Sequence, residues 1–176
     1  GTVEFLRDRQ GEFYVIETNT RIQVEHPATE AVTNLDIVKA QLAIAAGEGA
    51  GMRQRDLKVS GHAIEFRLIA EDPDRDFRPD TGVITELRLP GGPGVRVDTH
   101  VFSGYEVSPY YDPLLAKVIV VGSTRDEAVR RGRRALSETV VGGLATNVGL
   151  HQDILRDQRF SSPPGQVWLK RITDRS

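Results

Sequence analysis

The feature that most constrains the fold is a series of β-type stretches in the central part of the chain, separated by turn residues. Residues 59–70 alternate in part between polar and apolar side chains, and residues 83–89 alternate as well. A period of two gives a strand one polar and one apolar face, which is typical of antiparallel sheets. Further strands are predicted over 95–101 and 114–121, and the Pro- and Gly-rich run 90–94 predicts a turn.

Two segments with helical periodicity follow these strands. Residues 126–136 form a predicted amphipathic helix with a strongly basic face. Thr146 and Asn147 precede a second predicted helix over 148–155, and both are residue types that cap helix N-termini. An antiparallel sheet with flanking helices makes this part of the chain an α+β domain.

The first fifty residues have a different pattern. Residues 3–6 and 12–17 are predicted strands of a β-hairpin, because a short polar turn containing Gly joins two runs of β-forming residues. The polar stretch 18–26 is a predicted loop. Pro27 can open a short helix, and Asp36 is placed to cap a second one that ends near a glycine.

A Gly- and Arg-rich connector over residues 47–55 is the predicted domain boundary. We therefore expect one domain portion over residues 1–50 and a second domain over residues 56–176. The sequence has no initiator Met, and Val3 already belongs to a predicted strand. We expect from this that the chain starts inside a larger fold.

Composition excludes several classes of function. The net charge of −2 gives no sign of a nucleic-acid-binding face or of a basic membrane-binding arm. The absence of cysteine excludes disulfides and thiol nucleophiles, and the four His residues lack the spacing of a zinc site. No apolar run approaches the roughly 20 residues that span a bilayer, and no secretory leader is visible. The expected location is cytoplasmic.

The segment Glu17 to Pro27 (ETNTRIQVEHP) concentrates polar and charged side chains. Glu17 ends one predicted strand and Glu4 lies on its expected hairpin partner, so the two carboxylates are expected to face each other. Mg²⁺ prefers one or two carboxylates together with phosphate oxygens, so Glu4, Glu17 and Asn19 form a candidate clamp for ATP and Mg²⁺. The alternative is a solvated strand face, on which exposed Glu is common.

Arg21 and Glu25 form a second candidate group in the same segment. The planar donor fork of Arg21 suits a small oxyanion such as a carboxylate or bicarbonate. Glu25, four positions later, can serve as a general base. The alternative is a surface ion pair between the two side chains, which contributes little to stability.

The run ETNTRIQVEHPATE (Glu17 to Glu30) closely resembles the active-site segment of biotin carboxylases. Further matches occur in the same order along nearly the whole chain. They are GHAIEFR (Gly61 to Arg67), AEDP (Ala70 to Pro73), PGG (Pro90 to Gly92), YYDP (Tyr110 to Pro113) and TNV (Thr146 to Val148). The resemblance implies the last hairpin and loop of an ATP-grasp domain, followed by the antiparallel C-terminal domain of that family.

The resemblance also implies a role for matched residues. Glu4 and Glu17, with Asn19, are expected to hold the Mg²⁺ (or Mn²⁺) of ATP. Arg21 is expected to bind bicarbonate, and Glu25 to deprotonate it for attack on the γ-phosphate, which gives carboxyphosphate. These roles replace the solvated-surface interpretations of the same side chains, and they suit phosphoryl transfer, which depends mainly on charge neutralisation.

Three further roles follow from the same matches. Gln23 and Val24 are expected to contact bicarbonate and the biotin ring, and Arg67 to bind biotin and stabilise the enolate of its ureido group. A fixed cation aimed at a developing oxyanion is an effective catalyst, and arginine stays protonated. The implied reaction is ATP- and bicarbonate-dependent carboxylation of biotin on a biotin carboxyl carrier protein, the first half-reaction of an acyl-CoA carboxylase.

The expected partners are a biotin carboxyl carrier protein or domain, a carboxyltransferase subunit or domain, and a second copy in a homodimer. Pro93 stands where relatives often carry an aromatic residue of the dimer contact, although Arg96 is retained. The Gly-rich phosphate loop of the family is absent from this sequence, so the chain alone is expected to be inactive. The alternatives are the same module within pyruvate or urea carboxylase, a non-catalytic module that binds the carrier or a partner protein, and another ATP-grasp ligase.

Other motif residues are expected to be structural. His26 is predicted to satisfy backbone groups in a turn, and Tyr110 and its neighbours to pack near the site. Lys117 and His151 are expected at the surface. The basic cluster Arg130 to Arg134 is predicted to be a solvated helix face, and a final strand anchored by Trp168 is predicted over 167–172.

Overall fold

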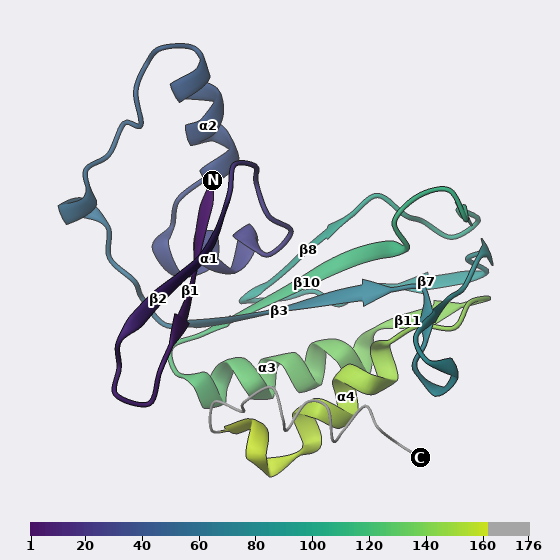
Figure 1. Cartoon of the computed structure of the whole chain (residues 1–176). Helices are drawn as coiled ribbons and strands as arrows, with labels where there is room; N and C mark the ends of the chain where they lie inside the picture. Colours follow the sequence, from purple (N-terminus) through teal and green to yellow (C-terminus); the bar gives the residue numbers. More distant parts are fainter. Residues whose placement is uncertain (162–176) are drawn as a thin grey trace. The chain divides into compact units, whose positions relative to one another are not determined.

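A computed structural model describes residues 1–161 of the chain (Figure 1). The chain divides into two compact units, one over Gly1–Val59 and one that starts at Ser60. Each unit has its own secondary structure and is described by itself below. The predicted strand over 167–172 lies outside the described residues.

The first unit contains the predicted hairpin. Strands β1 (Thr2–Arg7) and β2 (Phe13–Asn19) pair antiparallel, with Glu4 opposite Glu17. A register shift after Glu4 adds a bulge to the ladder at this point. The hairpin prediction is confirmed, and the register brings the two carboxylates to the same place on the two strands.

Two short helices follow the hairpin, as expected. Helix α1 (His26–Thr33) has Pro27 in its first turn, where its missing N–H costs no hydrogen bond. Helix α2 (Ile37–Ala45) is capped by Asp36, whose Oδ1 accepts the N–H of Lys39 at 2.7 Å. The buried carboxylate of Glu30 in α1 accepts the N–H of Ile37, which joins the two helices. The 3₁₀ turn η1 (Gln54–Asp56) lies in the connector.

The second unit is built on a three-stranded antiparallel sheet in the order β3-β10-β8. Its strands are β3 (His62–Ile69), β10 (Leu114–Gly122) and β8 (Val95–Thr99). Strand β10 is central and buried on both faces, in agreement with its nearly continuous apolar sequence. The predicted antiparallel sheet is confirmed.

Helices α3 (Arg125–Glu138) and α4 (Val148–Arg156) cover one face of this sheet (Figure 1). Thr124 caps α3 by accepting the N–H of Glu127. The main core lies between these helices and the sheet, and the 3₁₀ turn η3 (Gln158–Ser161) follows α4. The buried core residues are Phe66, Leu68, Ala116, Val118, Val120, Val129, Ala135, Leu136, Val148 and Leu155.

Short strand pairs extend the unit beyond the main sheet. They are β4 (Glu71–Asp72) with β5 (Arg78–Pro79), β6 (Gly82–Val83) with β9 (Glu106–Val107), and β7 (Glu86–Arg88) with β11 (Val140–Gly142). The 3₁₀ turn η2 (Pro73–Arg75) lies between β4 and β5. A second core cluster of Ala70, Ile84, Val101, Val107 and Leu115 holds these elements together.

Two strand boundaries differ from the prediction. The stretch 83–89 is divided at Ile84, because the chain changes partner there from β9 to β11: Ile84 N–H donates to Tyr105, and Thr85 N–H to Gly142. Strand β8 ends at Thr99, whose hydroxyl accepts the N–H of Val101 and so closes a local turn.

One side-chain prediction on the helices is wrong, and a second holds only in part. Asn147 precedes α4 but makes no side-chain capping hydrogen bond to it, because its amide is engaged by strand β3. The basic cluster on α3 is only partly a solvated face: Arg131 donates to the Val121 carbonyl and Arg133 to that of Leu155, so both tie the helix to its neighbours. Within residues 1–161, no helix is both long and apolar enough to cross a bilayer.

Candidate functional site

The first unit brings together two carboxylates and an amide that the sequence predicted as a group. Asn19 Nδ2 lies 2.9 Å from Glu4 Oε1 and 3.1 Å from Glu17 Oε1, so one amide group donates to both carboxylates. The hairpin register produces this arrangement, because Glu4 and Glu17 are Cα partners and Asn19 lies two residues after Glu17 on the same face.

Gln23 joins this cluster from the loop that follows β2. Its Nε2 donates to Glu4 Oε1 at 2.8 Å, so Glu4 accepts hydrogen bonds from two side-chain amides. Glu4 is half-buried, which strengthens both bonds relative to a fully hydrated carboxylate. The contact fixes the start of the loop on the hairpin, and it links the predicted metal group to the predicted substrate-binding residues.

The donor set suits Mg²⁺, provided that other oxygen ligands complete the shell. Glu4 and Glu17 supply carboxylate oxygens, and Asn19 would supply its amide oxygen after rotation about its terminal bond. Within the described residues, no group of three or more His, Asp or Glu side chains has the arrangement of a metal site. Mg²⁺ here would therefore take its remaining ligands from phosphate oxygens and water, which is its usual behaviour.

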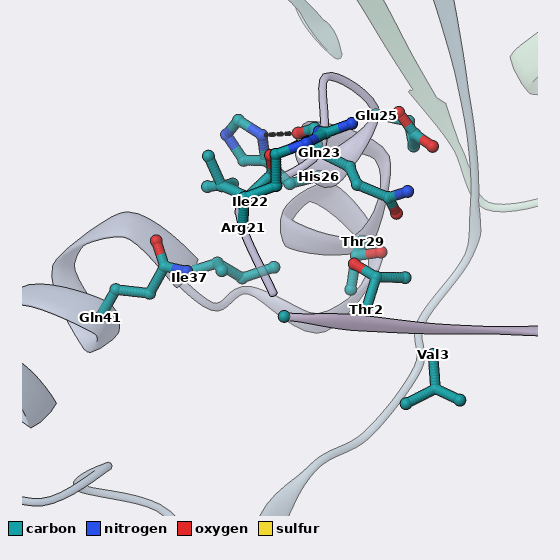
Figure 2. Close-up of a pocket in the computed structure, with 11 residues that line it drawn as sticks. Thr2, Val3, Arg21, Ile22, Gln23, Glu25, His26, Thr29, Ile37 and Gln41 are labelled. Carbon is teal, nitrogen blue, oxygen red and sulfur yellow. Dashed lines mark hydrogen bonds between the residues drawn. The ribbon is translucent and has the colours of Figure 1, made fainter. Parts of the chain in front are cut away.

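A pocket of about 360 Å³ opens beside this cluster in the first unit. Strand β1, the loop after β2, and helices α1 and α2 all contribute to its wall (Figure 2). The lining residues are Gly1, Thr2, Val3, Arg21, Ile22, Gln23, Glu25, His26, Thr29, Ile37 and Gln41. Three of these residues, Arg21, Gln23 and Glu25, are candidates for substrate binding and catalysis from the sequence.

The loop from Arg21 to Glu25 is held by local hydrogen bonds. Arg21 Nη1 donates to the Ile22 carbonyl at 3.2 Å, and His26 Nδ1 lies 2.6 Å from the Gln23 carbonyl, the contact that is dashed in Figure 2. The contact of His26 with a backbone group agrees with the structural role expected for it. Its ring therefore belongs to the wall of the pocket and also fixes the turn that carries Gln23.

Glu25 is the residue before the first turn of α1, yet its side chain makes no capping bond to that helix. It is exposed and lines the pocket together with Arg21. A carboxylate and a guanidinium at one pocket can bind an oxyanion and accept a proton from it. Val24, 37% exposed, lies in the same loop.

The remaining predicted site residue, Arg67, belongs to the second unit. It lies on β3 opposite Lys117 of β10, and Lys117 lies opposite Asp98 of β8. The Lys117 side chain is 14% exposed and its Nζ lies 3.6 Å from Asp98 Oδ2, so the expected solvated lysine is wrong. Burial raises the pKa of Asp98, but Arg96 and Lys117 outweigh it, and the net pKa lies below its ordinary value.

The main chain of Arg67 is held by two side chains that sequence analysis did not connect with it. Asn147 Nδ2 donates to the Arg67 carbonyl at 3.1 Å, and His151 Nε2 lies 3.0 Å from the same oxygen. His151 is half-buried against Phe66, so the expected surface position is wrong. Burial lowers the pKa of His151, and the contact with the Arg67 carbonyl opposes that effect in part.

Each of the two units matches a known protein family model. Residues 65–168 match the family model of the biotin carboxylase C-terminal domain. The chain belongs to the biotin carboxylase family. Residues 1–52 match the ATP-binding domain of the carbamoyl-phosphate synthase large chain, so the predicted combination of an ATP-grasp portion and a biotin carboxylase C-terminal domain is confirmed.

Curated relatives support the assignment to the biotin carboxylase family. The chain is 54% identical to biotin carboxylase of Haemophilus influenzae over 160 residues, which are 91% of this chain and 35% of that protein. It is 50% identical to a pyruvate carboxylase subunit from Methanothermobacter thermautotrophicus, with coverage of 91% and 32%. The chain therefore spans about a third of the length of these relatives.

A solved biotin carboxylase domain has the same fold. It is the dimeric domain of 2-oxoglutarate carboxylase from Hydrogenobacter thermophilus, in complex with MgADP, ADP and bicarbonate. The TM-score is 0.93 and the identity 42%, and the match covers 99% of this chain and 39% of that domain. The urea amidolyase of K. lactis, 45% identical over 90% of this chain, is a further structural relative with a TM-score of 0.84; the match covers 10% of that chain.

Proposed function

We propose that this chain supplies the metal, bicarbonate and biotin contacts of an ATP-dependent biotin carboxylase. The observation that carries the proposal is the continuous group formed by Glu4, Glu17, Asn19 and Gln23 beside a pocket that is lined by Arg21 and Glu25. Solvated surface carboxylates have no need of shared amide donors, so this organisation favours a binding site over a solvated strand face.

The first chemical step would take place at the pocket of the first unit. Arg21 holds bicarbonate with its guanidinium fork, and Glu25 accepts the bicarbonate proton. The deprotonated oxygen then attacks the γ-phosphorus of ATP; the bond to the β-γ bridging oxygen breaks, and ADP and carboxyphosphate form. Mg²⁺ held by Glu4, Glu17 and Asn19 would neutralise phosphate charge during the transfer.

The second step would use Arg67 and the substrate contacts of the loop. Carboxyphosphate breaks down to carbon dioxide and phosphate, and the phosphate accepts the proton of the ureido nitrogen of biotin. That nitrogen then attacks carbon dioxide, and carboxybiotin forms. Between these two events the negative charge lies on the ureido oxygen, where a guanidinium stabilises it. We assign this guanidinium to Arg67, and we assign contacts with bicarbonate and the biotin ring to Gln23 and Val24.

The proposed partners follow from the reaction. Biotin would arrive on a carrier protein or domain, and a carboxyltransferase would consume carboxybiotin. A homodimer is proposed from the dimeric relative. We propose that the residue roles of the two chemical steps are divided between an ATP-grasp portion over residues 1–50 and a C-terminal domain over residues 56–176. The acceptor is left open, because the relatives include both a biotin carboxylase and a pyruvate carboxylase subunit.

The test is bicarbonate-dependent ADP release with and without biotin, in a protein of the relatives' full length that contains these residues. Biotin should stimulate turnover. Glu25→Gln should lower the stimulated rate by roughly 10²- to 10⁴-fold while ATP affinity stays unchanged, because only the base is lost. Glu12→Gln, on the exposed hairpin turn outside the pocket, is the matched control and should keep the parental rate.

Arg67→Ala separates the two steps. It should lower biotin-dependent carboxylation and leave biotin-independent ADP release near the parental rate, because bicarbonate and metal contacts lie in the other unit. ATP turnover that biotin does not affect would contradict the proposed reaction and favour another ATP-grasp ligase. Carrier binding by a folded full-length protein that has no turnover would favour a non-catalytic binding module.

A further inference from the structure

We infer that Asn147 is a positioning residue for Arg67: its side-chain amide holds the main chain of β3 and thereby aims the guanidinium. Asn147 gains this role only if Arg67 acts as proposed above, so the role rests on the proposed function. Asn147 is 4% exposed, and it comes just before the first turn of α4, about 80 residues after its partners in β3.

Strand β3 lies at one end of its sheet. Among residues 1–161, the order β3-β10-β8 gives β3 a strand neighbour on one side only. The alternate main-chain groups on its outer side therefore need partners from outside the ladder. Asn147 supplies them: its Oδ1 accepts the N–H of Ile69 at 3.0 Å, and its Nδ2 donates to the Arg67 carbonyl at 3.1 Å. One side chain thus takes the place of a neighbouring strand at these two residues.

Several further hydrogen bonds join Asn147 and its neighbours to β3. The main-chain N–H of Asn147 donates to the Ile69 carbonyl at 3.2 Å, so backbone and side chain both engage β3. His151, one turn later, contacts the Arg67 carbonyl from α4. Asn147 Nδ2 also donates to Glu71 Oε1 at 3.0 Å, which extends the network into β4. The backbone from the Arg67 carbonyl to Ile69 is therefore fixed relative to the start of α4.

The contacts of Asn147 with β3 are chemically specific. The site needs one donor and one acceptor on the same short side chain, and asparagine provides both. An aspartate of the same shape keeps the acceptor for Ile69 but loses the donor, and its carboxylate would face the Arg67 carbonyl and Glu71. Burial already raises the pKa of Glu71, although its bond with Asn147 opposes that effect, so a second carboxylate there is unfavourable.

The test uses Asn147→Asp in the full-length protein. We expect biotin-dependent carboxylation to fall roughly 10- to 100-fold, since small displacements of a catalytic group have effects of this size. Biotin-independent, bicarbonate-dependent ADP release should stay within about twofold of the parental rate, because it uses residues of the first unit. The Asn147→Asp, Glu71→Gln double variant removes the carboxylate repulsion, and the defect should persist because the donor to Arg67 is still missing.

Gln152→Ala is the matched control. Gln152 also lies on α4, and its amide donates to a main-chain carbonyl, that of Leu136, at 2.9 Å. The variant removes a comparable side-chain hydrogen bond without touching β3, so it should lower the melting temperature but leave the biotin-dependent rate unchanged. A second readout is hydrogen exchange at the Ile69 amide, which should accelerate in Asn147→Ala and stay parental in Gln152→Ala.

The outcomes separate the two proposals. A parent without biotin-stimulated turnover contradicts the proposed function, and the positioning role is then withdrawn with it. An active parent whose Asn147→Asp variant keeps its biotin-dependent rate contradicts the positioning role alone. A parallel loss of both activities, a full recovery in the double variant, or unchanged exchange at Ile69 would also overturn it, because each would mean that the amide does not act through the main chain of Arg67.

Discussion

At the scale of single residues, Lys117 in the sheet of the second unit pairs with a carboxylate, although a solvated side chain was predicted from the sequence. Lys117 is 14% exposed and contacts Asp98, which also receives a bidentate pair from Arg96 at 2.8 and 2.9 Å. Arg67 is the partner of Lys117 in the ladder on the other side from Asp98. Two positive side chains therefore lie side by side on β3 and β10, and the carboxylate of Asp98 on β8 balances part of their charge.

His151 makes stability depend on pH in a defined range. Its pKa is lowered in the folded state by burial, so below its ordinary value of 6.5 the unfolded chain binds a proton that the folded chain excludes. Stability from this residue is therefore complete above about pH 6.5 and is lost as the pH falls below it. Urea unfolding at about pH 7.5 and about pH 5.5, on either side of that value, measures this difference, and His151→Gln should reduce it. An unchanged difference would show that other groups produce it.

Some of the candidate site could be predicted from residue types and spacing, because hairpin pairing places Glu4 opposite Glu17 through local geometry. Arg21 and Glu25 could be named as candidates because they lie in one short polar segment beside that hairpin, whereas the role expected of Gln23 came from the resemblance to biotin carboxylases. The contacts of Asn147 and His151 with Arg67 could not be predicted in this way. They join residues about 80 positions apart, and no local pattern encodes such a pairing.

At the scale of secondary-structure elements, glycines at two helix positions have opposite consequences. A Cβ on Gly132 of α3 would lie 2.9 Å from Phe66 Cζ and 3.1 Å from Leu155 Cδ1, both in the buried core. Gly132→Ala should destabilise the protein by about 1 kcal/mol, because overpacking outweighs the gain in helix propensity. Among the described residues, no atom lies within 4 Å of such a Cβ on Gly149 of α4, so Gly149→Ala should stabilise the protein by about 0.5 kcal/mol.

Urea unfolding of the two variants measures the change in the free energy of unfolding, which should have opposite signs. If Gly132→Ala is as stable as Gly149→Ala, the helix α3 can move away from β3 at little cost, and the close packing at Gly132 is not a constraint. The comparison is matched because the chemical change is the same and both glycines lie within helices of the second unit.

The longer strands and helices could be predicted from periodicity, whereas several of their ends depend on tertiary contacts. The cap of α2 was predicted because Asp36 accepts an N–H only three positions away, and Thr124 caps α3 in the same local way. Asparagine commonly caps helices, but the side-chain amide of Asn147 bonds to the main chain of β3 instead of to α4. The break at Ile84 has the same origin, because its position depends on where β9 and β11 lie.

At the scale of the whole molecule, the two units differ in how they bury apolar surface. The core clusters lie in the second unit, whereas the hairpin of the first exposes large apolar side chains, such as Phe5 at 51% and Phe13 at 66%. Exposed apolar surface of this extent is typical of an interface. Stability of this chain is therefore expected to reside mainly in the second unit.

A matched pair of Leu→Ala variants tests this distribution. Leu68 of β3 is fully buried, so Leu68→Ala should lower the free energy of unfolding by about 2–5 kcal/mol. Leu42 of α2 is 67% exposed, so Leu42→Ala should change it by no more than about 0.5 kcal/mol. Both are measured by urea unfolding of this chain. A large effect of Leu42→Ala would mean that its side chain is covered in solution.

The long connection between Asn147 and β3 also has a consequence during synthesis. The ribosome completes Arg67 about 80 residues before Asn147 is made, which at roughly 5–20 residues per second is a delay of roughly 4–16 s. The same delay separates the emergence of β3 from the exit tunnel and the emergence of Asn147. Within it β3 can pair with β10 once β10 has emerged, but the outer edge of β3 stays open until the start of α4 leaves the tunnel. The nascent chain therefore carries an uncovered strand edge for several seconds, and chaperones have a defined period in which to protect it.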